Sequence, residues 1–151
     1  MPNPNSKTTG DFEIRGINHL ALVCKDMART VDFYTDVLGF PLIKTLDLPN
    51  GLGQHFFFDI GNGNLLGFFD FPGHDHPAFS ETIGAVQHIA LSTSDEEFAA
   101  VRTRLDGAGV EYIGPDRGID NSLYIRDPNG VGIEFYAEKL GVFEGEPLLS
   151  S

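Results

Sequence analysis

Apolar residues recur with two different periods along the first half of the chain. A run rich in Ile, Leu and Val at residues 16–24 predicts a β-strand. Asp26 can cap the helix that follows, and Gly39 stands where a helix commonly ends. Between them, apolar residues recur at helical spacing, at Met27, Val31, Tyr34 and Leu38. Strand-like runs then follow at 40–46, 54–60 and 65–71, so this half predicts the order βαβββ.

The second half of the chain predicts the same order of elements. Residues 86–93 form a strand-like run, and Ser94 with Glu97 forms a capping box at the start of a helix. One stripe of this helix is apolar, with Phe98, Val101 and Leu105, and Gly107 and Gly109 follow at its end. Further strand-like runs lie at 110–113, 122–126 and 131–137, the last two joined by a turn at 127–130.

Direct comparison of the two halves reveals an internal repeat. Residues 19–22 read His-Leu-Ala-Leu, and residues 88–91, which lie 69 positions later, read His-Ile-Ala-Leu. Asn62 and Gly63 likewise match Asn129 and Gly130, at an offset of 67. We therefore predict an α+β fold of two βαβββ modules. Their predicted bounds are 12–71 and 85–138, with a linker at 72–84 and flexible tails at 1–11 and 139–151.

Net charge and cysteine content restrict the possible binding partners and the cellular compartment of the protein. The chain has 22 Asp and Glu against 10 Lys and Arg, a formal charge of −12, which disfavours nucleic acid and anionic membranes as partners. No apolar run is long enough to span a bilayer. The single cysteine, Cys24, cannot form an internal disulfide and is expected to fill the core. Since no signal-peptide pattern is visible either, we expect a cytoplasmic protein.

Three residues stand out as candidates for chemistry. His19 and His88 occupy matching points of the two copies, and an approximate two-fold axis would bring their first strands side by side. A single mid-strand histidine is more often a satisfied core or edge residue, but a duplicated one suggests selection. Glu134 lies in the otherwise apolar strand 133–136, where an unpaired carboxylate is costly and a bound cation removes the cost. The alternative is that Glu134 faces solvent.

The sequence resembles the vicinal oxygen chelate superfamily, which includes glyoxalases, extradiol dioxygenases, fosfomycin-resistance enzymes and bleomycin-resistance proteins. The residues that carry the resemblance are 16–22, 33–40, 86–90 and 124–134. The resemblance implies two modules that form a cupped mixed sheet around one divalent metal ion, held by His19, His88 and Glu134. Two imidazoles and one carboxylate leave about half of an octahedron open and suit Fe(II), with Mn, Co, Ni or Zn as alternatives.

The sequence offers several candidates for a fourth metal ligand and for the acid-base residues. The resemblance implies that glyoxalases add a ligand from the last strand of the first module, but here the 67-residue offset places Gly67 opposite Glu134. His55, which strand alternation places on the same inward face as Phe57, is the candidate for a fourth ligand or for acid-base work. The alternative is that it is an exposed residue at a loop edge. Tyr124 is implied as a hydrogen-bond donor to bound substrate. In the linker, His74 and His76 are either acid-base candidates or simply solvated.

Three functions follow, in order of preference. The first is Fe(II) dioxygenase-like oxidation of a small, oxygen-chelating substrate, which the 13 Phe residues suggest is aromatic. The second is a glyoxalase-like lyase or isomerase reaction, and the third is metal-free binding of a drug or metabolite by an acidic protein. We expect a homodimer, whose modules pair within one chain or are exchanged between two.

Overall fold

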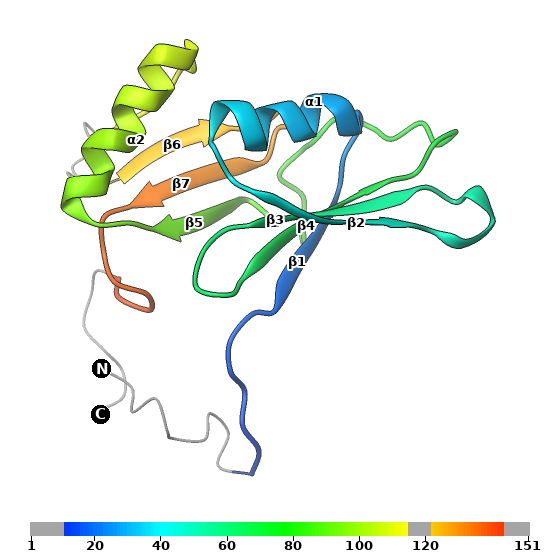
Figure 1. The fold of residues 1–151 in the computed structure, drawn as a ribbon, viewed down its shortest axis with the longest axis horizontal. Helices are drawn as coiled ribbons and strands as arrows, with labels where there is room; N and C mark the ends of the chain where they lie inside the picture. Colours follow the sequence, from blue (N-terminus) through cyan, green and yellow to red (C-terminus); the bar gives the residue numbers. More distant parts are fainter. Residues whose placement is uncertain (1–10, 115–121, 144–151) are drawn as a thin grey trace.

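The computed structural model describes residues 11–114 and 122–143 (Figure 1). The first half contains β1 (His19–Val23), α1 (Met27–Asp32), the π-helix η1 (Phe33–Val37), β2 (Leu42–Asp47), the 3₁₀-helix η2 (Pro49–Gly51), β3 (Gln54–Asp59) and β4 (Leu65–Asp70). The second half contains β5 (His88–Ser92), α2 (Asp95–Ala108), β6 (Ser122–Arg126) and β7 (Gly132–Tyr136). We call these two sets the first and the second module.

Each module forms its own mixed sheet. The first sheet has the order β1-β4-β3-β2 and the second the order β5-β7-β6. In both sheets the first strand runs parallel to the last one, with His19 opposite Leu65 and His88 opposite Gly132. The predicted α+β class and the internal repeat are thus confirmed. Within the described residues β1 and β5 each end a sheet and do not pair with one another, contrary to the expectation that they lie side by side.

Several predicted elements differ in detail. Residues 110–113 were expected to form a strand, but only an isolated bridge between Ile113 and Tyr124 forms there. The first predicted helix continues past Asp32 as the π-helix η1 and stops before Gly39, whose φ of 77° is in the left-handed region. The second helix has the predicted N-cap, since Ser94 accepts a hydrogen bond from the Glu97 amide. Of the predicted tails, residue 11 and residues 139–143 are described, and the rest lies outside the described residues.

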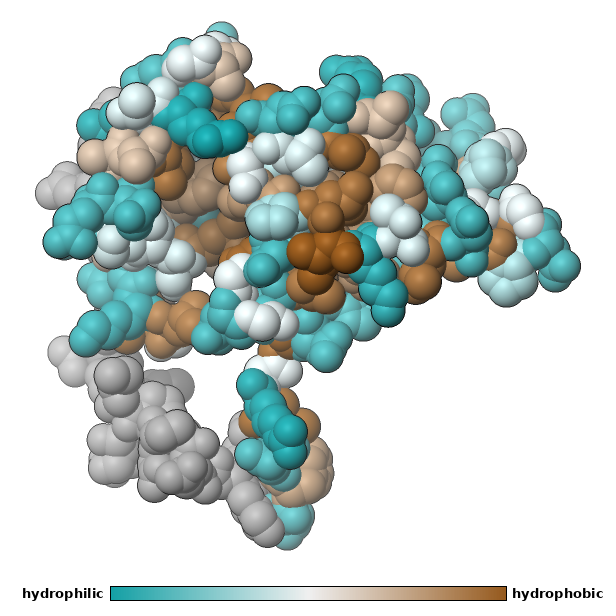
Figure 2. Space-filling model, viewed as in Figure 1, coloured by the Kyte–Doolittle hydropathy of each residue, from teal (hydrophilic) through white to brown (hydrophobic). Residues whose placement is uncertain are grey.

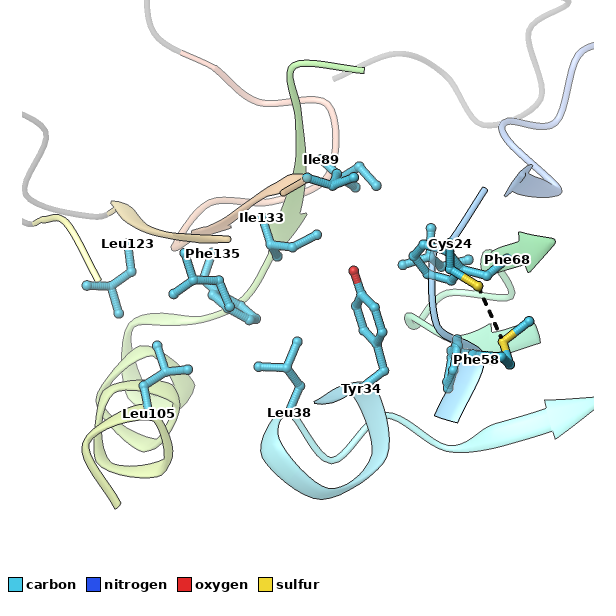
Figure 3. Close-up of a cluster of buried hydrophobic side chains, with 14 of the residues drawn as sticks. Cys24, Tyr34, Leu38, Phe58, Phe68, Ile89, Leu105, Leu123, Ile133 and Phe135 are labelled. Carbon is cyan, nitrogen blue, oxygen red and sulfur yellow. Dashed lines mark hydrogen bonds between the residues drawn. The ribbon is translucent and has the colours of Figure 1, made fainter. Parts of the chain in front are cut away.

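The core lies between the helices and one face of each sheet and is continuous across the modules. Tyr34, Phe58 and Phe68 are fully buried, and Figure 3 shows the ring of Tyr34 between these first-module residues and Ile133 and Phe135 of the second module. Cys24 also lies in this core, as predicted, and burial raises the pKa of its thiol to about 11. None of the described helices is both long and apolar enough to cross a membrane.

Hydrogen bonds join the first helix to the second module. The Tyr34 hydroxyl donates to Asp127 Oδ2 over 2.8 Å, and burial, with a contribution from this carboxylate, raises the pKa of Tyr34. Asp127 also organises the predicted 127–130 turn, because its other oxygen accepts from the amides of Asn129 and Val131. On the other side, Arg104 of α2 donates to the carbonyl of Val37 over 2.7 Å. The two modules therefore sit in a defined arrangement.

The opposite face of each sheet turns away from the helices, and we call it the cup face. Strand alternation and the register place His19, His55 and Gly67 on the cup face of the first module, and His88 and Glu134 on that of the second. Figure 2 shows apolar residues over the strands of the first sheet, with hydrophilic residues below them. The candidate residues for chemistry therefore lie on the faces that the helices leave open.

Candidate metal centre

The second module brings together an imidazole and a carboxylate. His88 Nε2 on β5 lies 3.3 Å from Glu134 Oε1 on β7. Glu134 is 1% exposed, so the alternative that it faces solvent is wrong. Its second oxygen accepts a hydrogen bond of 2.7 Å from Ser122 Oγ on β6. The carboxylate is thus buried, oriented by a hydroxyl and directed at an imidazole.

Amide side chains orient both histidines of the repeat in the same way. His19 Nδ1 is 2.8 Å from the side-chain oxygen of Asn18, and His88 Nδ1 contacts that of Gln87. Asn18 and Gln87 are themselves 69 positions apart. A metal-binding imidazole commonly donates its other ring N–H to such an acceptor, which leaves Nε2 as the coordinating atom. The sequence analysis missed this pair, although the repeat offset contained the signal.

The first module brings together two imidazoles. The ring of His55 stacks on Phe69 at 3.7 Å, lies 4.1 Å from Phe57, and is 6.3 Å from the ring of His19. His55 is 7% exposed, so the alternative of an exposed residue at a loop edge is wrong. Burial, with a smaller contribution from His19, lowers the pKa of His55. His55 is therefore a neutral imidazole enclosed by aromatic rings.

Within residues 11–114 and 122–143, no group of three or more metal-binding side chains comes together. His19 therefore does not join His88 and Glu134 within one chain. Each module instead presents a pair of nitrogen or oxygen donors on its cup face. Neutral imidazole and carboxylate are donors that suit divalent transition metals, and the buried Glu134 carboxylate fits a cationic ligand. The donor set of the two pairs together fits such an ion.

The remaining predicted residues lie at two different places. Tyr124 on β6 is opposite Glu134, with its ring 5.9 Å from that of His88, so it borders the second donor pair. His74 and His76 are exposed in the segment that follows β4. They contact Phe71, which stacks on Phe69 at 5.3 Å, so a row of rings separates them from His55. The structure thus places Tyr124, but not the two linker histidines, beside a donor pair.

The fold has a counterpart among known proteins. The sequence profile of the Glyoxalase/Bleomycin resistance protein/Dioxygenase superfamily matches residues 16–135, and the chain belongs to this superfamily. This agrees with the resemblance that the motifs indicated.

The proteins to which this chain is similar have names that indicate different activities. A lactoylglutathione lyase of Escherichia coli O157:H7 is 30% identical over 123 residues, which cover 80% of this chain and 91% of that protein. A catechol-2,3-dioxygenase of Bacillus subtilis strain 168 is 26% identical over 131 residues, 87% of this chain and 44% of that protein. A glyoxylase/bleomycin resistance protein/dioxygenase domain from Frankia sp. EAN1pec has a similar fold, with a TM-score of 0.70, 19% identity and coverage of 85% and 96%.

Proposed function

We propose that this protein is a divalent-metal-dependent enzyme that binds two neighbouring oxygens of a small organic substrate. His19, His88 and Glu134 are the proposed ligands of the ion. The observation that carries this proposal is the fully buried Glu134 carboxylate, which faces His88 Nε2 at 3.3 Å. A buried carboxylate is costly unless a cation or several hydrogen bonds compensate it, and a metal ion held jointly with His88 would do so.

The proposed ion is shared between two copies of the chain. His19 is not beside His88 and Glu134 in one copy, so we propose that His19 of one copy meets the His88–Glu134 pair of the other. The sheet edges support this assembly. Among the described strands, β1 and β5 each carry one unpaired edge, as β2 and β6 do, and an unpaired edge can pair with a strand of another chain. The proposed protein is therefore a homodimer with two equivalent sites.

Other residues of the chain have proposed roles in binding the substrate and stabilising its charge. The bound ion would supply a Lewis acid that orients the substrate and stabilises negative charge on its oxygens. Tyr124 lies beside the donor pair of the second module and would donate a hydrogen bond to such an oxygen. Phe57 and Phe69 line the cup face of the first module, where they would exclude water and contact an apolar part of the substrate.

Two reaction types are candidates. Fe(II) dioxygenase-like oxidation rests on the three-ligand set, which leaves room on the ion for both substrate and O₂. A lyase or isomerase reaction is the second candidate, favoured by the match to a lactoylglutathione lyase over most of both chains. O₂ consumption by the Fe(II)-loaded protein with a panel of catechols and enolisable acids supports the first. Turnover without O₂ by the Ni-, Co- or Mn-loaded protein supports the second.

Glu134→Gln tests the metal site directly. We expect the wild-type protein to retain one divalent ion per chain after gentle purification, measured by elemental analysis, and Glu134→Gln to lose it. Glu96→Gln, an exposed position on α2, is the matched control and should retain the ion. A wild-type protein that holds no stoichiometric ion would favour metal-free binding of a metabolite instead, and retention by Glu134→Gln would refute the ligand assignment.

A further inference from the structure

We propose that His55 is a fourth protein ligand of the ion, so that the first module contributes two imidazoles, His19 and His55. This inference rests on the proposed metal site and concerns only how that site is completed. It gives the site three nitrogen donors and one carboxylate. The argument begins with the internal repeat, because the two modules differ at the position of the carboxylate.

Strand register identifies the equivalent positions of the two modules. Glu134 on β7 is paired with Ala90 on one side and Tyr124 on the other. Gly67 on β4 is paired in the same way with Ala21 and Phe57. Gly67 is therefore the structural counterpart of Glu134, and the space above Gly67 corresponds to the space that the Glu134 side chain occupies.

His55 fills that space from the neighbouring strand. A Cβ atom built on Gly67 would lie 2.7 Å from His55 Nε2, well inside van der Waals contact. The counterpart of His55 at the 67-residue offset is Ser122, whose hydroxyl reaches the Glu134 carboxylate over 2.7 Å. The same position in both modules thus points at the site of the carboxylate. Where the carboxylate is missing, the longer imidazole side chain takes its place.

The nitrogen that reaches this space has no partner. Within the described residues, His55 Nε2 is one of two buried side-chain nitrogens without a hydrogen bond, the other being Arg102 Nε. Buried polar atoms are almost always satisfied, so an unpartnered one on a cup face indicates a missing ligand. The His55 side chain is only 7% exposed. Its burial favours the neutral imidazole, whose unprotonated ring nitrogen offers a lone pair to a metal ion.

His55 also lies at a suitable separation from His19. Their ring centres are 6.3 Å apart. With metal–nitrogen bonds of about 2.1 Å, two imidazoles that share an ion have ring centres roughly 4.5–6.5 Å apart, depending on the angle at the metal. The observed distance is near the upper end of this range, so the two rings fit a common ion if their nitrogens take nearly opposite positions on it. Enclosure between Phe57 and Phe69 holds His55 in this orientation, as a structural ligand requires.

A fourth ligand changes which reaction the site supports. A six-coordinate ion with four protein ligands keeps two positions, which suffice for two neighbouring oxygens of a substrate. No position is then left for O₂ while the substrate is chelated. The inference therefore favours the lyase or isomerase candidate over oxidation.

Metal titration of the full-length protein tests the role of His55. Metal-free wild type, His55→Phe and Glu134→Gln are titrated with Co(II) in competition with a chromophoric chelator, and the visible spectrum of bound Co(II) is recorded. We expect His55→Phe to bind Co(II) more than about 100-fold more weakly, since loss of outer-shell partners alone costs roughly 10- to 100-fold. The Co(II) bands should also shift, because one nitrogen donor is lost. Gln54→Ala, an exposed position on the same strand, should behave as wild type.

A second variant guards against a folding defect in the first. His55→Ala combined with Gly67→Glu moves the fourth donor to the position equivalent to Glu134. We expect this double variant to recover binding to within about 10-fold of wild type, whereas His55→Ala alone stays weak. Circular dichroism of the metal-free proteins checks that each is folded.

The outcomes separate the two proposals. A folded His55→Phe or His55→Ala with wild-type affinity and an unchanged Co(II) spectrum would overturn the role of His55, while loss of binding in Glu134→Gln would still support the metal enzyme. A wild-type protein that binds no Co(II) would overturn the proposed function itself.

Discussion

The two modules share one fold but present different chemistry on their cup faces. The second module offers a carboxylate, a hydroxyl and a phenol around His88, from Glu134, Ser122 and Tyr124. The first module offers His19 and His55 among the rings of Phe57 and Phe69. At the equivalent positions 67 and 134 one module has glycine and the other glutamate. A duplicated unit has thus become one polar half and one aromatic half.

Under the proposed function, this difference means that neither module is a complete site. Two donors from one module would leave most of an ion exposed to solvent. Two unlike modules together would supply more donors and cover more of the ion. The polar half suits the oxygens of a substrate and the aromatic half suits its apolar body. The predictions below test whether the two halves work as one site, beginning with the largest expected effect.

Mixing two inactive variants should restore metal binding if the halves come from different chains. His19→Ala lacks a ligand of the first module and Glu134→Gln lacks one of the second, so each alone should retain no ion. A heterodimer of the two has one site with all native ligands. After refolding of an equal mixture, statistical pairing predicts about a quarter of the wild-type metal content by elemental analysis.

The matched control for this experiment uses two variants of the same module. His88→Ala mixed with Glu134→Gln should recover no ion, because every pairing leaves each site without one ligand. A mixture of His19→Ala and Glu134→Gln that stays empty as well would show that the site is not shared between chains.

Ser122→Ala should weaken metal binding without abolishing it. Ser122 orients Glu134 by a hydrogen bond of 2.7 Å but is not itself a proposed ligand. Removal of such a partner typically costs about 10- to 100-fold in metal affinity. Chelator competition measures the effect, with Ser80→Ala, an exposed position, as the control. An unchanged affinity would mean that β7 alone holds the carboxylate in place.

Local patterns predicted much of the fold and of the site. The spacing of apolar residues identified the strands and helices, and the 69-residue repeat singled out His19 and His88. Strand alternation placed His55 on the inward face, because side-chain direction depends only on position along one strand. A carboxylate inside an apolar run singled out Glu134, since that placement is costly without a partner.

What escaped prediction depends on contacts between distant strands. The approach of His55 Nε2 to Gly67 follows from the register of β3 against β4, which the sequence pattern does not specify. The hydrogen bond from Ser122 to Glu134 depends likewise on β6 and β7. Residues 110–113 have strand-like composition, yet only one bridge forms there, because strand pairing needs a neighbour as well as a propensity.

Tyr34→Phe should lower the stability of each chain by a moderate amount and leave metal binding intact. The Tyr34 hydroxyl joins the modules through a 2.8 Å hydrogen bond to the buried Asp127. Loss of a hydrogen bond to a charged group costs about 1–3 kcal/mol. For a chain of this size each kcal/mol corresponds to roughly 2–4 °C in the melting temperature, which thermal unfolding of the metal-free protein measures.

A double-mutant cycle with Asp127→Asn assigns this effect to the joint between the modules. If the hydroxyl and the carboxylate act as a pair, the double variant should lose less stability than the sum of the two single variants, by about 1 kcal/mol. Additive losses would indicate that Tyr34 contributes only by packing its ring between Phe58 and Phe68 of the first module and the apolar residues of the second. The cycle thus separates a specific link between the two halves from general burial of an aromatic ring in their common core.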